Sequence, residues 1–594
     1  MIKDRITALR QAMRQKKLDA YIIPSHDPHQ SEYVTDHWKS REWLSGFDGS
    51  AGTLVVTADF AGLWTDSRYF LQAEKQLNGS GITLQKQVIP HAPEHVTWLV
   101  NHLPQGATVG VDGQLFSLSQ IRYLAKNFYE KDIDIIHEHD LIGEIWKDRP
   151  TLPDAPVFEH PVEYSGRNRE EKLALVRRQM QEKDLQYWLV STLDDIAWIL
   201  NLRSSDVSYN PLFISYLIIG QEISYLFIQP GKISEELQEE LAAQGIFIKD
   251  YTYIENFVSS LSPDKTIAID PSATSIHLFN AIPEGQSQQE KNIIRQIKAI
   301  KTEHEVTHIR QAMVKDGVAL TRLFRWLAEE LKERSVSEVE VATQLAEFRS
   351  QQAHYYGESF GAIVGYNGNG AIVHYRPEPK SCAMIKPEGI LLLDSGGQYL
   401  DGTTDITRTI ALSTPTAQQK RHFTLVLKGH IALSTMKFPE GTSGAQLDGF
   451  ARQYLWQDGL NFGHGTGHGV GYFLNVHEPP QGFATSAVTS RGATPFEPGM
   501  LTSNEPGFYR NDHYGIRVEN LELCVKAENT EYGQFLKFET LTLFPIDRNL
   551  LDMELLTEQE KNWLNTYHRQ VFEKLSPHLE AAEVEWMQEQ CREL

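Results

Sequence analysis

The sequence is poor in cysteine. Its 594 residues include three cysteines, Cys382, Cys524 and Cys591, and no C-x-x-C pair. So few thiols cannot form the disulfide framework of a small secreted domain, and the lack of a C-x-x-C pair excludes a zinc ribbon. We therefore expect a reducing compartment and predict that the chain is cytoplasmic.

Long apolar runs and an excess of basic residues are also lacking. The most apolar stretch, 212–228, is interrupted by Gln221 and Glu222 and is too short to span a bilayer. The N-terminal residues are charged where a secretory signal needs an apolar core. The net charge is −22, whereas nucleic-acid binders present basic surfaces. We expect neither membrane nor nucleic-acid partners.

What the sequence does contain is the composition of a folded protein with several domains. Apolar residues make up 41% and charged residues 23%, both ordinary values. Residues 10–27 and 177–194 are similar at a constant offset of 167, and each is a helical pattern followed by a short apolar strand pattern. The similarity is either a chance likeness of two helix–strand segments or the mark of two related α/β domains in tandem. The Pro-rich segment 149–156 between the copies favours the second interpretation.

We predict three domains, with residues 1–149, 150–301 and 302–594. In the third, helical patterns cover 303–334, 337–353, 417–436 and 443–457, and strand patterns cover 390–394 and 403–410. The last 40 or so residues return to a polar helical pattern, which predicts a surface appendage.

Two pairs of carboxylates in the third region are candidates for a cation site. Asp394 and Asp405 lie on successive predicted strands joined by a tight loop, so a hairpin would bring them onto one face. Glu505 ends a predicted strand, and Glu519 follows fourteen residues later in another, over 515–521. Inward-pointing carboxylates repel unless a cation or proton separates them. Either Asp alone is more often a solvated turn residue. Arg517 is either a plain ion-pair partner of Glu519 or a group that orients a ligand carboxylate.

A glycine-rich run lies between the two pairs. Residues 463–471 contain five glycines and miss the G-x-G-x-x-G spacing of a dinucleotide loop. Such a run lets the backbone approach a ligand closely while His464 and His468 project from it. His477 follows nearby, and His374 precedes the first carboxylate.

Two Asp, two Glu and one His form an oxygen-rich set of ligands. It suits a pair of Mn²⁺, Co²⁺ or Zn²⁺ ions better than a structural zinc. Two bridged ions lower the pKa of a shared water and polarise a carbonyl oxygen. Histidines that do not bind metal can donate hydrogen bonds to a tetrahedral intermediate. The reaction class is hydrolysis of an amide or ester.

The motifs HYRP, LLLDSGGQYLDGTTDITRT, FGHGTGHGVG, LNVHEPP, SNEPGFY and GIRVEN resemble those of the M24 metallopeptidases. More narrowly, they are similar to the long, three-domain Xaa-Pro aminopeptidases of that family. SHDPHQSEY, LSGFDGSAGTLVVT and LWTDSRYFLQAE in the first region extend the resemblance over most of the chain.

The resemblance implies roles for individual residues. Asp405 and Glu519 would bridge two metal ions, Asp394 would bind one ion, and His468 with Glu505 would bind the other. Glu505 would also be the general base. Three histidines, His374, His464 and His477, would bind the substrate and stabilise the intermediate without binding metal. Arg517 would orient the ligand carboxylates without binding metal itself.

The resemblance also implies the fold and the reaction. The fold class is mixed α/β (α+β), with two creatinase-like α/β domains followed by a pita-bread catalytic domain. The activity would be removal of the N-terminal residue of Xaa-Pro peptides. The expected metal ion is Mn²⁺, and the expected assembly is a homodimer. The alternatives are a prolidase-type dipeptidase and a non-catalytic peptide-binding module. Two domains before the catalytic one favour the aminopeptidase over a prolidase, and the complete ligand set argues against the binding module.

Overall fold

The structure is a computed structural model that describes residues 2–88 and 92–594. It divides into two compact units: residues 1–160 with 167–294, and residues 161–166 with 295–594. The three domain boundaries predicted above stay predictions. Within the described residues, no helix combines the length and the apolar content that crossing a membrane requires. Cys382, Cys524 and Cys591 are free thiols.

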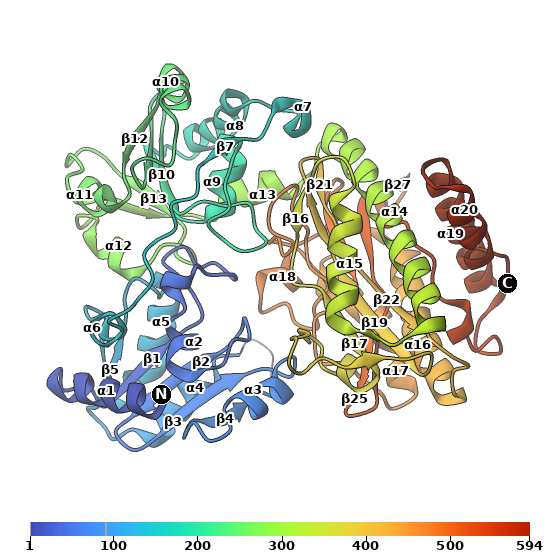
Figure 1. Cartoon of the computed structure of the whole chain (residues 1–594). Helices are drawn as coiled ribbons and strands as arrows, with labels where there is room; N and C mark the ends of the chain where they lie inside the picture. The colour runs from blue at the N-terminus through green and yellow to red at the C-terminus, as the bar shows by residue number, and fades with distance from the viewer. Residues whose placement is uncertain (1, 89–91) are drawn as a thin grey trace. The chain divides into compact units, whose positions relative to one another are not determined.

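The first unit contains two six-stranded sheets of the same topology (Figure 1). The first has the order β4-β3-β2-β1-β5-β6 and the second β12-β11-β10-β8-β13-β14. In both sheets, the strand that follows the repeated helix has one antiparallel and one parallel neighbour. β1 pairs antiparallel with β2 and parallel with β5, and β8 pairs antiparallel with β10 and parallel with β13. The offset of 167 residues is therefore a structural repeat. The elements of the first half are α1 (Ile2–Gln15), β1 (Ala20–Ile23), α2 (Ser40–Ser45), β2 (Thr53–Thr57), β3 (Ala61–Thr65), α3 (Phe70–Gln76), β4 (Thr83–Lys86), α4 (Glu94–His102), β5 (Thr108–Val111), α5 (Leu118–Phe128), β6 (Asp134–Ile136) and α6 (Leu141–Ile145).

Alternation along the strands builds the core of this unit. Ile22 of β1 joins an apolar cluster that also contains Leu189 of β8, so one core connects the two sheets. Its neighbours Tyr21 and Ile23 face a second cluster on the opposite side of the first sheet. The second half consists of β7 (Phe158–Glu159), α8 (Arg169–Glu182), β8 (Tyr187–Val190), α9 (Leu193–Leu200), β9 (Leu202–Arg203), β10 (Ser215–Gly220), β11 (Ser224–Ile228), α10 (Glu235–Ala243), β12 (Ile246–Asp250), α11 (Ile254–Ser259), β13 (Ile267–Ile269), α12 (Ile276–Ala281) and β14 (Ser287–Gln289), followed by α13 (Ile293–Ala299) at the division between the units.

The second unit packs long helices on small antiparallel sheets, which have the orders β17-β19-β22, β16-β20-β21 and β23-β28-β27-β24 (Figure 1). Its first long helix begins at a capping box formed by Thr302 and Glu305. The predicted helices are confirmed within a few residues. The elements are α7 (Val162–Ser165), α14 (Glu303–Glu333), β15 (Val336–Ser337), α15 (Glu338–Ser350), β16 (Tyr355–Glu358), β17 (Ile363–Tyr366), η4 (Asn367–Ala371), β18 (Met384–Ile385), β19 (Ile390–Ser395), β20 (Gly397–Tyr399), β21 (Gly402–Thr403), β22 (Ile406–Ala411), α16 (Ala417–Ser434), β23 (Lys437–Pro439), α17 (Gly444–Gln457), α18 (Ser490–Ala493), β24 (Leu501–Asn504), β25 (Gly507–Arg510), β26 (Tyr514–Arg517), β27 (Asn520–Thr530), β28 (Gly533–Thr540), α19 (Glu558–Leu575) and α20 (Ala581–Gln590).

The C-terminal helices α19 and α20 are not the surface appendage that the sequence predicts. Leu564, Val571 and Leu575 of α19 are fully buried and belong to the main core of the unit. They lie seven and four residues apart, so they form one stripe of an otherwise polar helix. The polar majority of the segment hides this stripe when composition alone is considered.

Candidate active site

The first carboxylate lies on the central strand of a three-stranded sheet. Asp394 is in β19, where it pairs with Ile363 of β17 on one side and Thr407 of β22 on the other. Its Oδ2 accepts a hydrogen bond of 2.5 Å from Nη2 of Arg517. Its Oδ1 is buried and has no hydrogen-bond partner within the described part of the chain. One oxygen of this buried carboxylate is thus held by a cation and the other suits a further cation.

Asp405 reaches the site by a longer route than the predicted tight hairpin. After β19 the chain forms β20 and β21, which pair with each other while β20 also pairs with β16. Asp405 then stands at the bend just before β22, not within a strand over 403–410. The predicted pairing of the two main strands holds, but the connection is a small separate sheet. Gly396 lies between β19 and β20, and the chain turns at 400–401 before β21 begins at Gly402.

Glu519 also lies in a break rather than in a continuous strand over 515–521. Residues 514–517 form β26 and pair with β25, whereas β27 begins at Asn520 and pairs with β24. At the break, the Glu519 amide donates to the carbonyl of Thr407 over 3.1 Å. The Glu519 carboxylate accepts a 2.8 Å hydrogen bond from Thr407 Oγ1. Thr407 is the cross-strand partner of Asp394, so this contact places the two carboxylates next to each other.

The glycine-rich run lies along β24 and brings the histidine to the carboxylates. The His468 amide donates to Ser503 Oγ, and the Ser503 amide donates to the carbonyl of His468. A Cβ atom at Gly467 would lie 1.8 Å from the carbonyl oxygen of Ser503, so only glycine permits this approach. One residue beyond β24, the Glu505 amide donates to the Thr466 carbonyl. The run therefore fixes His468 and Glu505 relative to each other.

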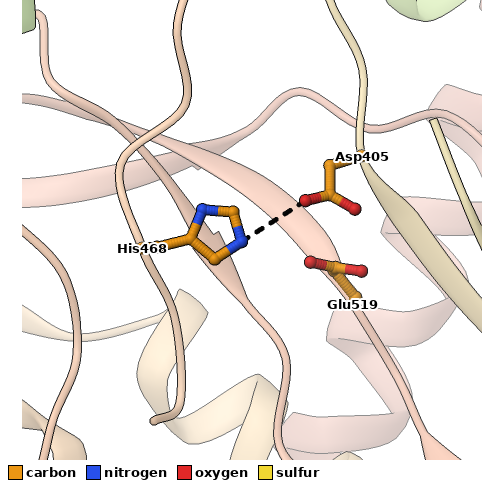
Figure 2. Close-up of side chains that lie close together, drawn as sticks. All are labelled: Asp405, His468 and Glu519. Atoms are coloured by element: carbon orange, nitrogen blue, oxygen red, sulfur yellow. Dashed lines mark ion pairs between the residues drawn. The ribbon is translucent and has the colours of Figure 1, made fainter. Parts of the chain in front are cut away.

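The contacts of the His468 imidazole suit a metal ligand. Its Nδ1 lies 2.9 Å from the carbonyl oxygen of Gly469, which can only accept, so Nδ1 carries a hydrogen. Its Nε2, which in the neutral ring carries the lone pair that binds a metal, lies 3.4 Å from Asp405 Oδ2 (Figure 2) and 3.5 Å from Glu505 Oε1. A lone pair that faces two carboxylates is unfavourable unless a cation or proton lies between them.

Three of the predicted ligands form a group that can hold a metal ion. One ligand atom each of Asp405, His468 and Glu519 lies within 4.8 Å of the others, and all three residues are buried (Figure 2). Burial and neighbouring carboxylates raise the pKa values of Asp405 and Glu519 well above their ordinary range. Burial raises the pKa of Glu505 to about 7. These raised pKa values mean that a cation or proton close to the carboxylates is favourable, and the donor set fits divalent metal ions.

His464 and Arg517 meet at a residue that the sequence analysis did not single out. The Tyr509 hydroxyl lies 2.7 Å from His464 Nε2 and accepts a 2.7 Å hydrogen bond from Arg517 Nη1. His464 Nδ1 lies 2.8 Å from the Gly465 carbonyl. Arg517 thus connects His464, through Tyr509, to Asp394, and its ion pair is with Asp394 rather than Glu519. The register of the β25–β26 hairpin is the signal that would have revealed Tyr509. It pairs Gly507 with Arg517, and Tyr509 lies on β25 only two residues after Gly507.

The other two predicted histidines lie around the same centre. The ring of His477 meets that of His468 edge-on, with the ring centroids 4.2 Å apart. His374 follows η4 and is half-buried. The carbonyl of its neighbour Val373 lies 3.5 Å from Arg517 Nη2. The structure thus places His477 against His468, and His374 directly after the residue whose carbonyl lies near Arg517.

We expect the stabilisation that a divalent ion gives this protein to increase with pH. Because the folded pKa of Glu505 is raised from 4.5 to about 7, the metal-free folded state binds protons that the unfolded chain releases. The free energy of unfolding of the metal-free protein therefore falls as the pH rises through this interval, and a bound cation removes this loss. Melting temperatures of chelated and Mn²⁺-loaded protein at pH 5.5 and 7.5 test this.

The difference between loaded and chelated protein isolates the site, because other buried carboxyls titrate in both forms. Glu522, whose pKa burial also raises to about 7, is one of these. A metal-induced shift in melting temperature of equal size at both pH values would contradict the prediction.

Models of known protein families match nearly the whole chain. Residues 5–142 and 148–305 each match a creatinase/prolidase N-terminal domain. Residues 307–526 match metallopeptidase family M24, and residues 534–594 match the C-terminal region of that peptidase family. Two copies of the N-terminal domain agree with the repeated sheet topology of the first unit.

Individual relatives are similar over most of their length. A probable Xaa-Pro aminopeptidase P of Laccaria bicolor is 41% identical, with 100% of this chain and 93% of the relative covered. Aminopeptidase P2 of Arabidopsis thaliana is also 41% identical, over 97% of this chain and 86% of its own. The crystal structure of an X-prolyl aminopeptidase from Caenorhabditis elegans, described as a cytosolic enzyme with a di-nuclear active site, superposes with a TM-score of 0.95 at 34% identity and covers 100% of both chains. The chain therefore belongs to metallopeptidase family M24, in its group of three-domain Xaa-Pro aminopeptidases, and is an enzyme.

Proposed function

We propose that this enzyme hydrolyses the N-terminal Xaa-Pro bond of peptides with two divalent metal ions held by five residues. The ligands would be Asp394, Asp405, His468, Glu505 and Glu519. The observation that supports this most strongly is the position of His468 Nε2, which faces the carboxylates of Asp405 and Glu505 inside a buried acidic cluster. When bound, such a pair of ions activates a water and polarises the scissile carbonyl.

The carboxylate best placed to move a proton is that of Glu505. Its side chain is 18% exposed, against 5% for Asp405 and 11% for Asp394. Glu519 is 1% exposed and accepts a hydrogen bond from Thr407. Glu505 is thus the ligand that an incoming water or peptide can reach. We propose that its carboxylate accepts the proton of the attacking water and that the proton then goes to the leaving proline nitrogen.

The histidines outside the ligand set would position the substrate. His374 and His477 lie at the rim of the cluster, and a protonated or Nε2–H ring there can donate to the carbonyl oxygen of the scissile bond. The contacts of His464 are to the Tyr509 hydroxyl and the Gly465 carbonyl, and they fit a role in holding the rim. Arg517 would keep Asp394 ionised and oriented.

The identity of the metal and the assembly stay proposals. Four carboxylates and one imidazole accept Mn²⁺, Co²⁺ and Zn²⁺, and we propose Mn²⁺ because hard oxygen ligands dominate the set. The homodimer and the cytoplasmic location are proposed from the resemblance to the three-domain enzymes. The C. elegans relative is described as cytosolic.

Cleavage of Arg-Pro-Pro and Gly-Pro by the Mn²⁺-loaded protein tests the proposed substrate class. We expect release of free arginine from Arg-Pro-Pro with a kcat/KM at least about tenfold above that for Gly-Pro, a difference of about 1.4 kcal/mol. Arg-Ala-Ala serves as the control for the proline requirement. Asp405→Asn protein, prepared in parallel, measures contaminating peptidase. Activity confined to Gly-Pro would show a prolidase-type dipeptidase instead.

A further inference from the structure

A buried carboxylate at the start of α15 collects hydrogen bonds from four groups. Glu338 is the first residue of the helix and is fully buried. It accepts hydrogen bonds of 2.7–3.1 Å from two backbone amides and two side chains, namely the amides of Tyr366 and Ala383, the Asn369 side chain and the Tyr375 hydroxyl. A carboxylate with this many donors holds them in one arrangement, because charge-assisted hydrogen bonds are short and strong.

The four donors lie on both sides of His374 in the sequence. Tyr366 ends β17 and Asn369 is in η4, whereas Tyr375 directly follows His374 and Ala383 precedes β18. The Glu338 amide also donates to the Ala383 carbonyl over 3.1 Å. Asn369 and Tyr375 are joined further by a 3.0 Å hydrogen bond. Glu338 therefore closes the segment 366–383 into a loop whose course is fixed on either side of the histidine.

This loop is held against the metal-binding elements. A Cβ atom at Gly515 would lie 1.7 Å from the carbonyl oxygen of Gly370, so η4 and β26 are in direct backbone contact. Two residues after Gly515, Arg517 binds Asp394, and its Nη2 lies 3.5 Å from the Val373 carbonyl. The loop is thus held beside β26, and through Arg517 beside Asp394. Glu338 binds loop residues on both sides of His374.

We propose that Glu338 is a positioning residue for the reaction, which acts by holding His374 at the rim of the active site. The inference rests on the proposed function, because it assigns His374 a role in stabilising the reacting carbonyl. A glutamine at position 338 has the same shape but a single acceptor oxygen, and its amide hydrogens would face the same donors. The loop would shift while the helix and core remain.

A double-mutant cycle of Glu338→Gln and His374→Ala tests the proposal. We expect each single variant to lower kcat by about tenfold to a hundredfold, with KM and bound metal little changed, because small misplacements have effects of this size. We expect the kcat of the double variant to be no lower than that of the less active single variant, because Glu338 acts through His374. Multiplicative losses in the double variant, or an unchanged kcat in Glu338→Gln, would overturn the inference.

Two further variants keep the test decisive. Tyr375→Phe removes one donor and leaves the carboxylate, so it applies if Glu338→Gln fails to fold; we expect a several-fold loss of kcat that disappears in the His374→Ala background. Glu522→Gln changes an equally buried glutamate that is bonded to Ser434 and Thr540, and should leave kcat unchanged. If His374→Ala retains full kcat the inference fails, while cleavage of Arg-Pro-Pro by the unmodified enzyme still supports the proposed function.

Discussion

Glu505→Gln is expected to lower kcat by about a thousandfold with little change in fold. The amide cannot accept a proton at neutral pH, and general acid–base groups contribute about 10²–10⁴-fold. Glu505 also lies 3.5 Å from His468 Nε2, so its charge contributes to the metal site. Glutamine is isosteric, and at this position the carboxyl is the most exposed of the four, so the core tolerates the change. Steady-state kinetics on Arg-Pro-Pro, circular dichroism and metal analysis measure the three properties.

Glu522→Gln is the matched control for this variant. Glu522 is buried and its pKa is also raised to about 7 by burial, but its side-chain partners are Ser434, Thr540 and Asn504 rather than the proposed metal ligands. Both variants replace a glutamate of raised pKa by its amide, and only one removes a proposed ligand. Near-normal kcat in Glu505→Gln, or an equal loss in both variants, would reject the assignment of Glu505 as the base.

Removal of divalent cations is expected to abolish activity, by about a thousandfold or more. That factor corresponds to about 4 kcal/mol, the scale on which metal ions stabilise developing charge. The structure gives a reason to expect this: burial and neighbouring carboxylates raise the pKa values of these groups, which favours protonation when no cation is bound, and a protonated carboxyl cannot accept the proton of the attacking water. Dialysis against a chelator, followed by reconstitution with Mn²⁺, Co²⁺ or Zn²⁺ and assay of each form, measures the effect.

The melting curve of the chelated protein shows whether the loss is local. We expect the main core to remain folded, because it is built from apolar residues of the helices and sheets rather than from the ligands. Asp405→Asn protein should not recover activity with any of the three ions. Full activity in a preparation that elemental analysis shows to be free of metal would refute the two-ion proposal.

The sequence by itself indicated most of the architecture. Apolar strand patterns and helical periodicity identified the long helices of the second unit, the strand Tyr187–Val190 and, as a strand over 390–394, Ile390–Ser395. The offset of 167 residues predicted the two related α/β halves, whose sheets share one topology. These features are local or repeated, so they leave a periodic signal in the chain.

The site depended on breaks in regular structure, and these are harder to predict. Asp405 and Glu519 both lie just outside strands, at bends where neighbouring strands change partners. Period-two alternation cannot describe such positions, so the predicted tight hairpin and the continuous strand over 515–521 were wrong. The buried face of α19 was missed for a related reason, because a stripe of apolar residues in an otherwise polar helix is a weak signal in the sequence and becomes clear only when the core against which it packs is known.

The sequence determined which chemical groups this protein has available: four carboxylates, several histidines in a glycine-rich setting, and their order along the chain. Only the tertiary structure decided how those groups act on one another. It turned Nε2 of His468 toward Asp405, assigned Arg517 to Asp394 rather than to Glu519, and placed Tyr509 between Arg517 and His464 and Glu338 beside Tyr375. The physical reason is that tautomers, ion pairs and pKa values depend on distance and burial, and both arise when segments more than a hundred residues apart pack together.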